Sequence, residues 1–302
     1  MDLVTPALIA EISADISSVA DDASLYEPKS FNGRANALDF MEFHIIDRLD
    51  SLPPTEELSH LKQWANKVKR RLESIDTRLF DQLREGIRDG LYTGPSFTRM
   101  IHEYTGFTIN NTKPNQPGYD NLDTFINGLL TDQPLPEPSE THNTEMVFYQ
   151  QTPARIIFQL VARANLQSHD VLVDIGSGLG HVPILVNLIS SATAKGIEYQ
   201  PAYCTYAQAC AAQLNLTQVQ FVNADARKAD YSQATVFFMY TPFKGTMLRE
   251  MLDILQTIAQ QRSISVFTYG PCSKDVAKQT WLSCVNGIVN DEYRLYEFGG
   301  IG

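Results

Sequence analysis

The feature that most constrains the fold is an apolar run ending in alternating glycines, residues 170–180 (DVLVDIGSGLG). Residues 171–173 have the apolar character of a parallel strand that is covered on both faces. Glycines permit a tight turn and let a ligand approach the backbone closely. The pattern therefore predicts a strand, a turn and a helix over about 179–190. Asp174 falls at the carboxyl end of the strand, where open α/β sheets bind their ligands.

The spacing of the glycines separates two classes of ligand. A dinucleotide fingerprint needs G-x-G-x-x-G/A, but here the sixth place is His181 and the third glycine, Gly180, comes one residue early. The pattern DIGSGLG instead resembles the first motif of class I S-adenosylmethionine-dependent methyltransferases. In that family the turn holds the methionine part of the cofactor. The resemblance implies S-adenosyl-L-methionine as cofactor, bound by Asp174, Gly176, Ser177, Gly178 and Gly180.

Composition excludes several classes of protein. The net charge is −11, with 13 basic and 23 acidic side chains in residues 1–140 and 11 and 12 in residues 141–302. Neither part has the basic excess typical of nucleic-acid binding, so a nucleic-acid acceptor is disfavoured. No apolar run approaches the roughly 18 residues of a membrane span, and residues 1–10 do not resemble a secretory signal. The four cysteines lack metal-ligand spacing, which predicts no metal and a cytoplasmic location with reduced thiols.

The first 140 residues predict a helical domain. Amphipathic patterns indicate helices over about 3–19 and 35–49. After Pro53-Pro54, Thr55 is a suitable cap for a helix of about thirty residues whose apolar positions repeat as a heptad over 58–83. Such a heptad is typical of a homodimer seam, or of a long helix packed within its own domain; we favour the second interpretation. Shorter helices follow at about 96–104 and 122–130, around a polar stretch at 110–118 that we expect to be a surface loop or a lid.

Three prolines at 134, 136 and 138 predict a linker and a domain boundary at about residue 140. Beyond it, helical and strand patterns alternate: a helix at about 152–164, strands at about 171–174, 194–198, 219–222, 236–240 and 264–269, and helices between them. The end of the chain, 284–289 and 293–298, indicates an antiparallel hairpin. This alternation predicts an α/β fold with a mostly parallel sheet. Closed by a hairpin, it is similar to the seven-stranded, Rossmann-like methyltransferase sheet.

Acidic residues follow the next two strands. Glu198 ends the second strand, where a carboxylate can accept hydrogen bonds from both ribose hydroxyls. In the resembled family this position is the ribose acid. Asp225 follows the third strand, where the family places an acid or amide against the adenine amino group, and the Ala226 N–H is expected to serve a ring nitrogen. Either acid alone also fits a capping or turn role. Together, polar sites at the ends of three consecutive strands favour the cofactor.

The fourth strand ends in Tyr240-Thr241-Pro242-Phe243. Amine and base methyltransferases of the family carry Asn/Asp-Pro-Pro-aromatic here, which holds the acceptor nitrogen. This chain keeps one proline and the aromatic ring but has Thr241 in place of the acid or amide. Tyr240, Thr241 and Phe243 are therefore the expected catalytic residues, and Tyr240 is also expected to contact the cofactor.

The segment before the sheet domain, MVFYQQTP at 146–153, resembles the stretch that covers the methionyl end of the cofactor in Dot1-type lysine methyltransferases. That resemblance adds Tyr149 and Thr152 to the expected cofactor site. His181 is expected to pack on the helix rather than to act as a base. The leading hypothesis is a methyltransferase whose acceptor is a small molecule or a protein side chain. Two alternatives are an inactive cofactor-binding regulatory or assembly subunit and a nucleotide-dependent oxidoreductase.

Overall fold

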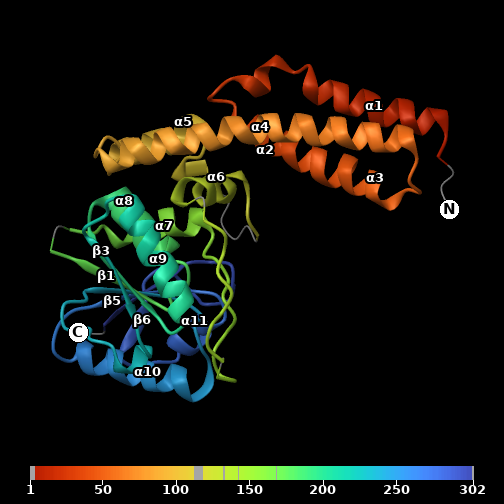
Figure 1. The fold of residues 1–302 in the computed structure, drawn as a ribbon. Coiled ribbons are helices and arrows are strands. Elements are labelled where there is room, and N and C mark those ends of the chain that lie inside the picture. The colour runs from red at the N-terminus through yellow and green to blue at the C-terminus, as the bar shows by residue number, and fades with distance from the viewer. Residues whose placement is uncertain (1–3, 112–117, 132, 142, 168, 301–302) are drawn as a thin grey trace.

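The computed structural model describes residues 4–111, 118–131, 133–141, 143–167 and 169–300. A domain built on a β-sheet forms the body of the molecule, and an arm of helices extends sideways from it (Figure 1). The N-terminal end of the arm lies far from the sheet. Most of the expected polar loop, residues 112–117, falls outside the described residues. None of the helices in the described ranges is long and apolar enough to cross a membrane.

The arm confirms the predicted helices, with one correction. It contains α1 (Pro6–Ala20), η1 (Ala23–Tyr26), α2 (Phe31–Asp39), η2 (Phe40–Ile46), α3 (Asp47–Ser51) and the first half of α4 (Glu56–Arg88). The second helix begins at Phe31 rather than near residue 35, and its middle, η2, is π-helical. Arg34 explains the earlier start. Its buried guanidinium donates to the carbonyls of Leu25 (3.2 Å) and Pro28 (3.0 Å), which anchors the first turn despite the weak helix former Gly33.

The long helix α4 is confirmed, and its heptad is covered by the same chain. Thr55 caps it by accepting from the Leu58 N–H (3.2 Å). The apolar side chains of its first half form one buried cluster with α1, η2 and α3. This agrees with a helix packed within its own region. A homodimer through the N-terminal helices would have to use other faces, and it stays a prediction.

The base of the arm shares a core with the body. The second half of α4, α5 (Pro95–Thr105) and α6 (Asn121–Leu130) belong to the same buried cluster as the helices and strands beneath them. Phe31 and Phe80 meet Phe125 edge to face, with ring centroids 4.9 and 5.4 Å apart. A short turn, η3 (Ile109–Asn111), joins this part to residues outside the described ranges. The division into domains at residue 140 stays a prediction, and the packing is continuous across it.

The body has the predicted α/β architecture with seven strands in one sheet. The strands are β1 (Val171–Ile175), β2 (Thr193–Glu198), β3 (Val219–Asn223), β4 (Val236–Tyr240), β5 (Ser265–Tyr269), β6 (Leu282–Cys284) and β7 (Tyr296–Gly300). Their order is β3-β2-β1-β4-β5-β7-β6, and only β7 runs antiparallel to its two neighbours. Between β1 and β4 the order reverses, so their carboxyl ends flank the switch point of the sheet.

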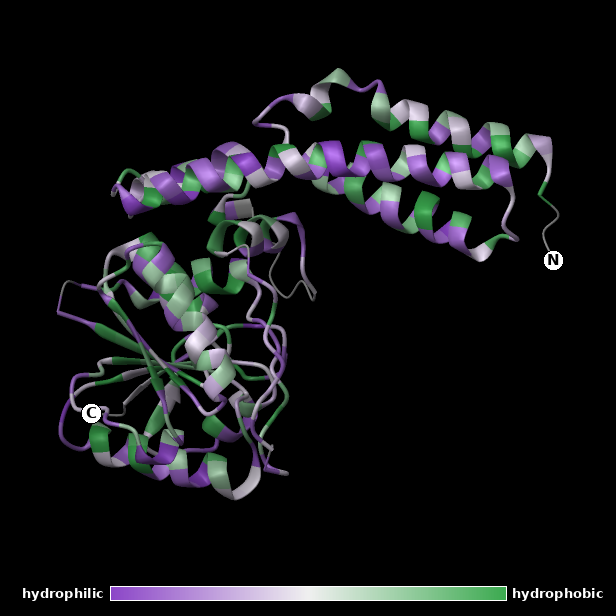
Figure 2. Cartoon of the chain, in the orientation of Figure 1, coloured by the Kyte–Doolittle hydropathy of each residue, from purple (hydrophilic) through white to green (hydrophobic). Residues whose placement is uncertain are grey.

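Helices cover both faces of the sheet. The strand side chains alternate between two buried clusters: one contains α7 (Ala154–Ala164), α8 (His181–Ser190) and α9 (Pro201–Gln213), and the other contains α10 (Gly245–Ala259) and α11 (Cys272–Val276). The central strands are accordingly green along much of their length in Figure 2, whereas the arm helices alternate between purple and green. This layering leaves the carboxyl edge of the parallel strands to the loops.

The C-terminal hairpin is confirmed as antiparallel, but its strands are shorter than predicted. Strand β6 ends at Cys284, where the first strand was expected to begin, and β7 begins at Tyr296 rather than at residue 293. Residues 285–295 form a loop instead. The Asn286 amide replaces strand pairing there, since it donates to Leu295 O (2.8 Å) and accepts from the Glu297 N–H (2.9 Å). The Tyr296 hydroxyl accepts from the backbone N–H groups of Asn290 and Asp291. Side chains thus satisfy the backbone groups that a longer ladder would have used. The short helix α11 was not predicted.

Candidate active site

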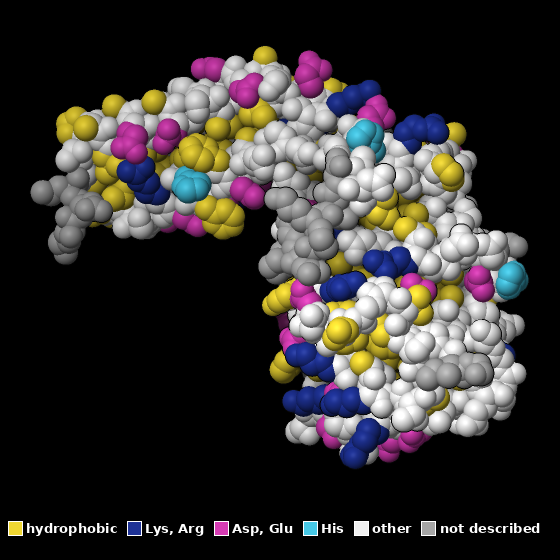
Figure 3. All heavy atoms as spheres, turned by 180° about the vertical axis from the view of Figure 1, so that it is seen from behind, with side chains coloured by type: hydrophobic (Ala, Val, Ile, Leu, Met, Phe, Trp, Pro, Cys, Tyr) yellow, Lys and Arg dark blue, Asp and Glu magenta, His cyan; other side chains and the backbone are white. Residues whose placement is uncertain are grey.

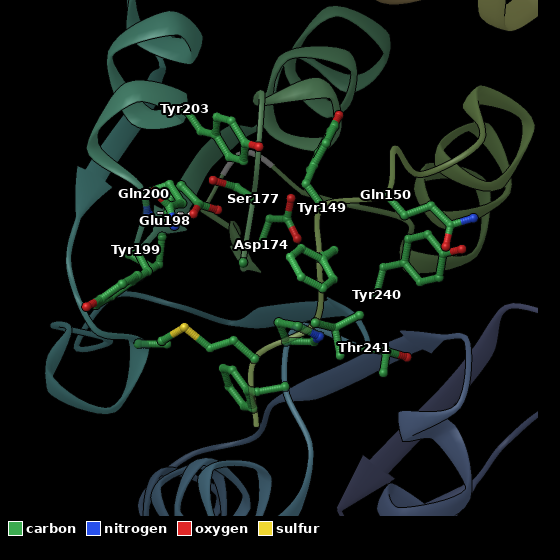
Figure 4. Close-up of a pocket in the computed structure, with 18 of the residues that line it drawn as sticks. Tyr149, Gln150, Asp174, Ser177, Glu198, Tyr199, Gln200, Tyr203, Tyr240 and Thr241 are labelled. Atoms are coloured by element: carbon green, nitrogen blue, oxygen red, sulfur yellow. Dashed lines mark hydrogen bonds between the residues drawn. The ribbon is translucent and has the colours of Figure 1, made fainter. Parts of the chain in front are cut away.

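A cavity of about 890 Å³, including its open mouth, lies at the carboxyl edge of β1, β2 and β4. Figure 4 shows Asp174 in the middle of it, with Glu198 and Tyr199 on one side and Tyr240 and Gln150 on the other. The structure brings all the expected residues except Gly178 and Gly180 to this wall, and Gly180 packs against Ala207 and Phe221. The lining residues from the predicted site are Tyr149, Thr152, Asp174, Gly176, Ser177, Glu198, Asp225, Ala226, Tyr240, Thr241 and Phe243, and Gly178 packs on Tyr149.

The glycine turn needs its glycines for conformation and for space. Gly176, Gly178 and Gly180 have φ of +79°, +52° and +87°, a region that disfavours other residues. A Cβ on Gly178 would lie 2.1 Å from the Tyr149 ring, and one on Gly176 would lie 2.5 Å from Pro242. The turn is therefore pressed between the segment that precedes the sheet domain and the loop after β4.

The backbone N–H groups of Gly176, Ser177 and Gly178 are already bonded within the protein. Gly178 N–H donates to Glu198 Oε2 (2.7 Å), and the N–H groups of Gly176 and Ser177 both donate to Ile197 O. A phosphate-binding turn keeps such N–H groups for its ligand. This turn instead uses them to fix its own shape against β2.

Two carboxyl groups face the same space. Burial, and next the negative charge of Glu198, raise the pKa of Asp174 well above its ordinary value. Glu198 is also buried, and its Oε1 accepts from the Gln200 N–H (2.7 Å). Each Glu198 oxygen thus accepts from a backbone N–H, and a carboxylate oxygen can accept more than one hydrogen bond. A cationic ligand group beside Asp174 would counter the effect of its burial.

Ser177 contributes a hydroxyl whose oxygen is buried and has no hydrogen-bond partner in the described structure. Its residue lines the cavity. Because a buried polar atom rarely goes without a partner, this hydroxyl is evidence for a polar ligand.

Asp225 stands at the cavity wall but is already paired. Its carboxylate accepts from Arg227 Nε (3.0 Å) and Nη2 (2.7 Å), and those hydrogen bonds are the main cause of its lowered pKa. Arg227 is shared with Glu250 (2.6 Å). Any contact with an adenine amino group must use the remaining lone pairs of Asp225. The neighbouring Ala226 is buried and lines the cavity.

At the end of β4, the Thr241 hydroxyl, which was expected to face a methyl acceptor, is bonded within the protein. The Thr241 hydroxyl donates to Tyr269 O (3.2 Å) and accepts from the Cys272 N–H (3.1 Å), so it ties the end of β4 to the end of β5 and the start of α11. Thr241 has φ of +40°, a strained conformation for a β-branched residue. Phe243 is 4% exposed and pairs with Met146 as an isolated antiparallel bridge. Burial raises the pKa of Tyr240, which keeps its hydroxyl protonated and able to donate.

The segment 146–153 closes one side of the cavity. Val147 N–H donates to Pro242 O (3.1 Å), which fixes its start to the β4 loop. The Tyr149 ring covers the turn and meets Tyr203 edge to face at 5.5 Å. Thr152 is buried at the far end.

Sequence reasoning missed three contributors. Gln200 is buried, and its amide bonds the backbone of Ser139 and Glu140, which holds the proline-rich linker against β2. Tyr203 lines the cavity and meets Tyr149 edge to face. Asn127 of α6 contacts His181 (2.9 Å), and burial lowers the pKa of His181 to about 4. No local pattern could reveal these contacts, since the partners are 54 to 61 residues apart.

Within the described part of the chain, no group of three or more His, Cys, Asp and Glu residues could hold a metal ion.

The family model described as histone methylation protein DOT1 matches residues 141–237. None of the curated protein sequences matches the chain.

Solved structures offer similar folds over about half of this chain. An RNA methyltransferase from Salinibacter ruber, in complex with S-adenosyl-L-homocysteine, is 22% identical, with a TM-score of 0.39 over 50% of this chain and 92% of that one. Precorrin-6y C5,15-methyltransferase from Geobacter metallireducens is 19% identical, with a TM-score of 0.39 over 51% and 92%. A methyltransferase from Thiobacillus denitrificans, also with S-adenosyl-L-homocysteine, is 18% identical, with a TM-score of 0.33 over 41% and 54%.

Proposed function

We propose that this protein binds S-adenosyl-L-methionine and transfers its methyl group to an acceptor. The observation that carries the proposal is the charge of the cavity. Among the described residues that line it there are three carboxyl groups, Asp174, Glu198 and Asp225, and neither Lys nor Arg. Asp225 is paired with Arg227, so it is Asp174 and Glu198, on a wall without a described Lys or Arg, that favour a ligand with positive charge. S-adenosylmethionine carries both a sulfonium and an ammonium group.

The same wall disfavours a dinucleotide. A pyrophosphate would meet the carboxyl groups of Asp174 and Glu198, and the N–H groups of Gly176, Ser177 and Gly178 already bond Ile197 and Glu198. This argument opposes the oxidoreductase alternative independently of the glycine spacing.

The residues present fit the parts of the cofactor. Asp174 and the unpartnered Ser177 hydroxyl suit its methionine part, Glu198 its ribose, and Asp225 with the Ala226 N–H its adenine. Tyr149 and Thr152 would cover the methionine end. The DOT1 match over residues 141–237 spans this set and supports the assignment.

When bound, the cofactor supplies an electrophilic methyl group for in-line displacement. The chain's own residues have to align the acceptor and exclude water, which requires no strong base. Tyr240 lies opposite Glu198 across the cavity (Figure 4), and Phe243 lines the same cavity, which supports that role for both. Tyr240 keeps its proton, so it orients an acceptor by donating a hydrogen bond rather than by removing a proton.

The acceptor is a small molecule or a protein side chain in this proposal. The description of the DOT1 family, histone methylation, favours a protein. A nucleic-acid acceptor is disfavoured: Figure 3 shows Lys and Arg side chains along one edge of the body with Asp and Glu among them. Pairs such as Lys274–Glu292 and Lys278–Asp275 leave little net positive charge. The four free cysteines remain the basis for proposing a cytoplasmic location.

The second candidate is a cofactor-binding regulatory or assembly subunit without turnover. It is favoured by Thr241, which stands at the position where amine methyltransferases carry an acid or amide. The Thr241 hydroxyl bonds the backbone of Tyr269 and Cys272 within the protein. Transfer of a labelled methyl group from the cofactor into a fractionated cell extract distinguishes the two. Incorporation that Phe243→Ala reduces supports the enzyme, whereas binding without incorporation supports the subunit.

Titration calorimetry tests the cofactor itself. We expect heat on addition of S-adenosylmethionine or S-adenosylhomocysteine and none on addition of NAD. Binding of NAD with no response to either sulfur compound would overturn the proposal.

A further inference from the structure

The lid of the cavity is held from outside by the helical region. This lid, residues 146–153, carries the Tyr149 ring that covers Gly178. Its first residues are fixed to the β4 loop through Val147 and Pro242. Further along the lid, the Gln151 side chain donates a hydrogen bond to Asn127 on α6.

The side-chain oxygen of Asn127, Oδ1, accepts hydrogen bonds from both Gln151 and His181. Gln151 Nε2 donates to it over 2.9 Å, and His181 Nε2 lies at 2.9 Å on the other side. Since an amide oxygen only accepts, His181 must carry its proton on Nε2. Its Nδ1 is then an acceptor, and it faces the Tyr149 hydroxyl at 3.5 Å. The chain of contacts therefore runs from α6 through His181 to the aromatic ring of the lid.

The lid ring forms a partition. Tyr149 and His181 line the cofactor cavity and also a second hollow of about 700 Å³, including its open mouth, which Asn127 and Gln151 line as well. If Tyr149 moved away from Gly178, the two spaces would merge and the methionine end of the site would lose its cover. A neutral His181 suits this arrangement, since burial lowers its pKa to about 4.

We propose that Asn127 is a positioning residue: its side-chain oxygen, acting through His181 and Gln151, holds Tyr149 over the glycine turn and so sets the affinity for the cofactor. This inference rests on the proposed function. It makes the helical region part of the cofactor site, although no side chain of α6 lines the cofactor cavity itself.

Variants of equal size isolate the oxygen. Asn127→Asp keeps an acceptor for both donors, whereas Asn127→Leu removes it. We expect Asn127→Leu to weaken S-adenosylhomocysteine binding about tenfold in calorimetry, the effect of one or two lost hydrogen bonds, and Asn127→Asp to stay within about twofold of the wild type. Asn121→Leu is the matched control, because Asn121 lies on the same helix but bonds Asn36. It should leave affinity unchanged.

A double-mutant cycle tests the route. If Asn127 acts through Tyr149, Asn127→Leu should have little further effect once Tyr149→Ala has removed the ring. Thermal melting of each variant reports whether it is folded, and the Asn127→Asp variant answers the question if Asn127→Leu is not.

The outcomes separate the two proposals. Wild-type affinity in Asn127→Leu, equal losses in Asn127→Leu and Asn127→Asp, or additive effects with Tyr149→Ala would overturn the inference while leaving the proposed function intact. A wild-type protein that binds neither S-adenosylmethionine nor S-adenosylhomocysteine would overturn both.

Discussion

The carboxylate of Glu198 accepts a hydrogen bond from the backbone N–H of Gly178 over 2.7 Å. The end of β2 is thereby joined to the middle of the turn after β1, twenty residues earlier. One side chain thus shapes the turn and also lines the cavity. Its two roles make Glu198 the most informative position to change.

Glu198→Ala should weaken cofactor binding by about 1–3 kcal/mol, because a charge-assisted contact and the support of the turn are lost together. Glu198→Gln keeps one accepting oxygen and should lose less. Calorimetry with S-adenosylhomocysteine measures both. The exposed Glu57, at the start of α4, provides the control Glu57→Gln. Unchanged affinity in Glu198→Ala would remove Glu198 from the site.

Without bound cofactor, the buried Asp174 carboxyl group should lower the free energy of unfolding when it is ionised. Its folded pKa is raised, so the folded state holds the proton more tightly than the unfolded state. Stability is then lost as pH rises from about 4 through the folded pKa, and Asp174→Asn should remove this loss. We expect the Asp174→Asn variant to melt at least about 2 °C higher than wild type at pH 7.5 and to bind the cofactor less well. Melting curves from pH 5 to 8 check the sign; a lower melting temperature of the variant at pH 7.5 contradicts it.

Phe243→Ala should leave cofactor affinity nearly intact and slow methyl transfer by about a hundredfold, since a misplacement of ~1 Å suffices for that loss. The measurement pairs calorimetry with single-turnover transfer to an acceptor found by label incorporation. Because Phe243 is buried, Phe243→Leu serves as the milder variant if the alanine protein is unstable. Loss of cofactor binding in a folded variant would assign Phe243 to the cofactor pocket instead.

Substitutions of Thr241 distinguish a structural role of its hydroxyl from a role in orienting the methyl acceptor. Thr241→Val removes the donor to Tyr269 O and leaves the Cys272 N–H without its acceptor, so the free energy of unfolding should fall by about 1–3 kcal/mol. Thr241→Ser retains both bonds and should stay close to wild type. Urea unfolding measures the difference. A valine variant of full stability that no longer transfers methyl groups would show that the hydroxyl serves the acceptor.

Limited proteolysis should cut the linker at 133–138, where the backbone is largely exposed and outside helices and strands. Residues 139 and 140 should resist, since the Gln200 amide bonds their backbone. The two fragments should still elute together in size-exclusion chromatography, because the base of the arm shares a core with the body. Preferential cutting inside 58–83 would argue against a boundary at residue 140.

The sequence by itself determined the local elements of this protein. The apolar run before Gly176 specifies β1, and the glycines specify a turn with positive φ, because both depend on the residues' own conformational preferences. Thr55 likewise predicts the start of α4, because the side chain of a capping residue accepts a hydrogen bond from the backbone N–H three residues later, here that of Leu58. The order of strands and helices then limited the sheet to few topologies.

Only the tertiary structure decided which polar side chains form hydrogen bonds within the protein and which remain available to a ligand in the cavity. Thr241 follows β4 as expected, yet its hydroxyl bonds Tyr269 and Cys272, about thirty residues away. Asn127 reaches His181 across 54 residues, and the C-terminal strands shift because Asn286 and Tyr296 satisfy the loop between them. A hydrogen bond is directional and short-ranged, so its partner is fixed by how distant elements pack and not by the spacing of residues along the chain.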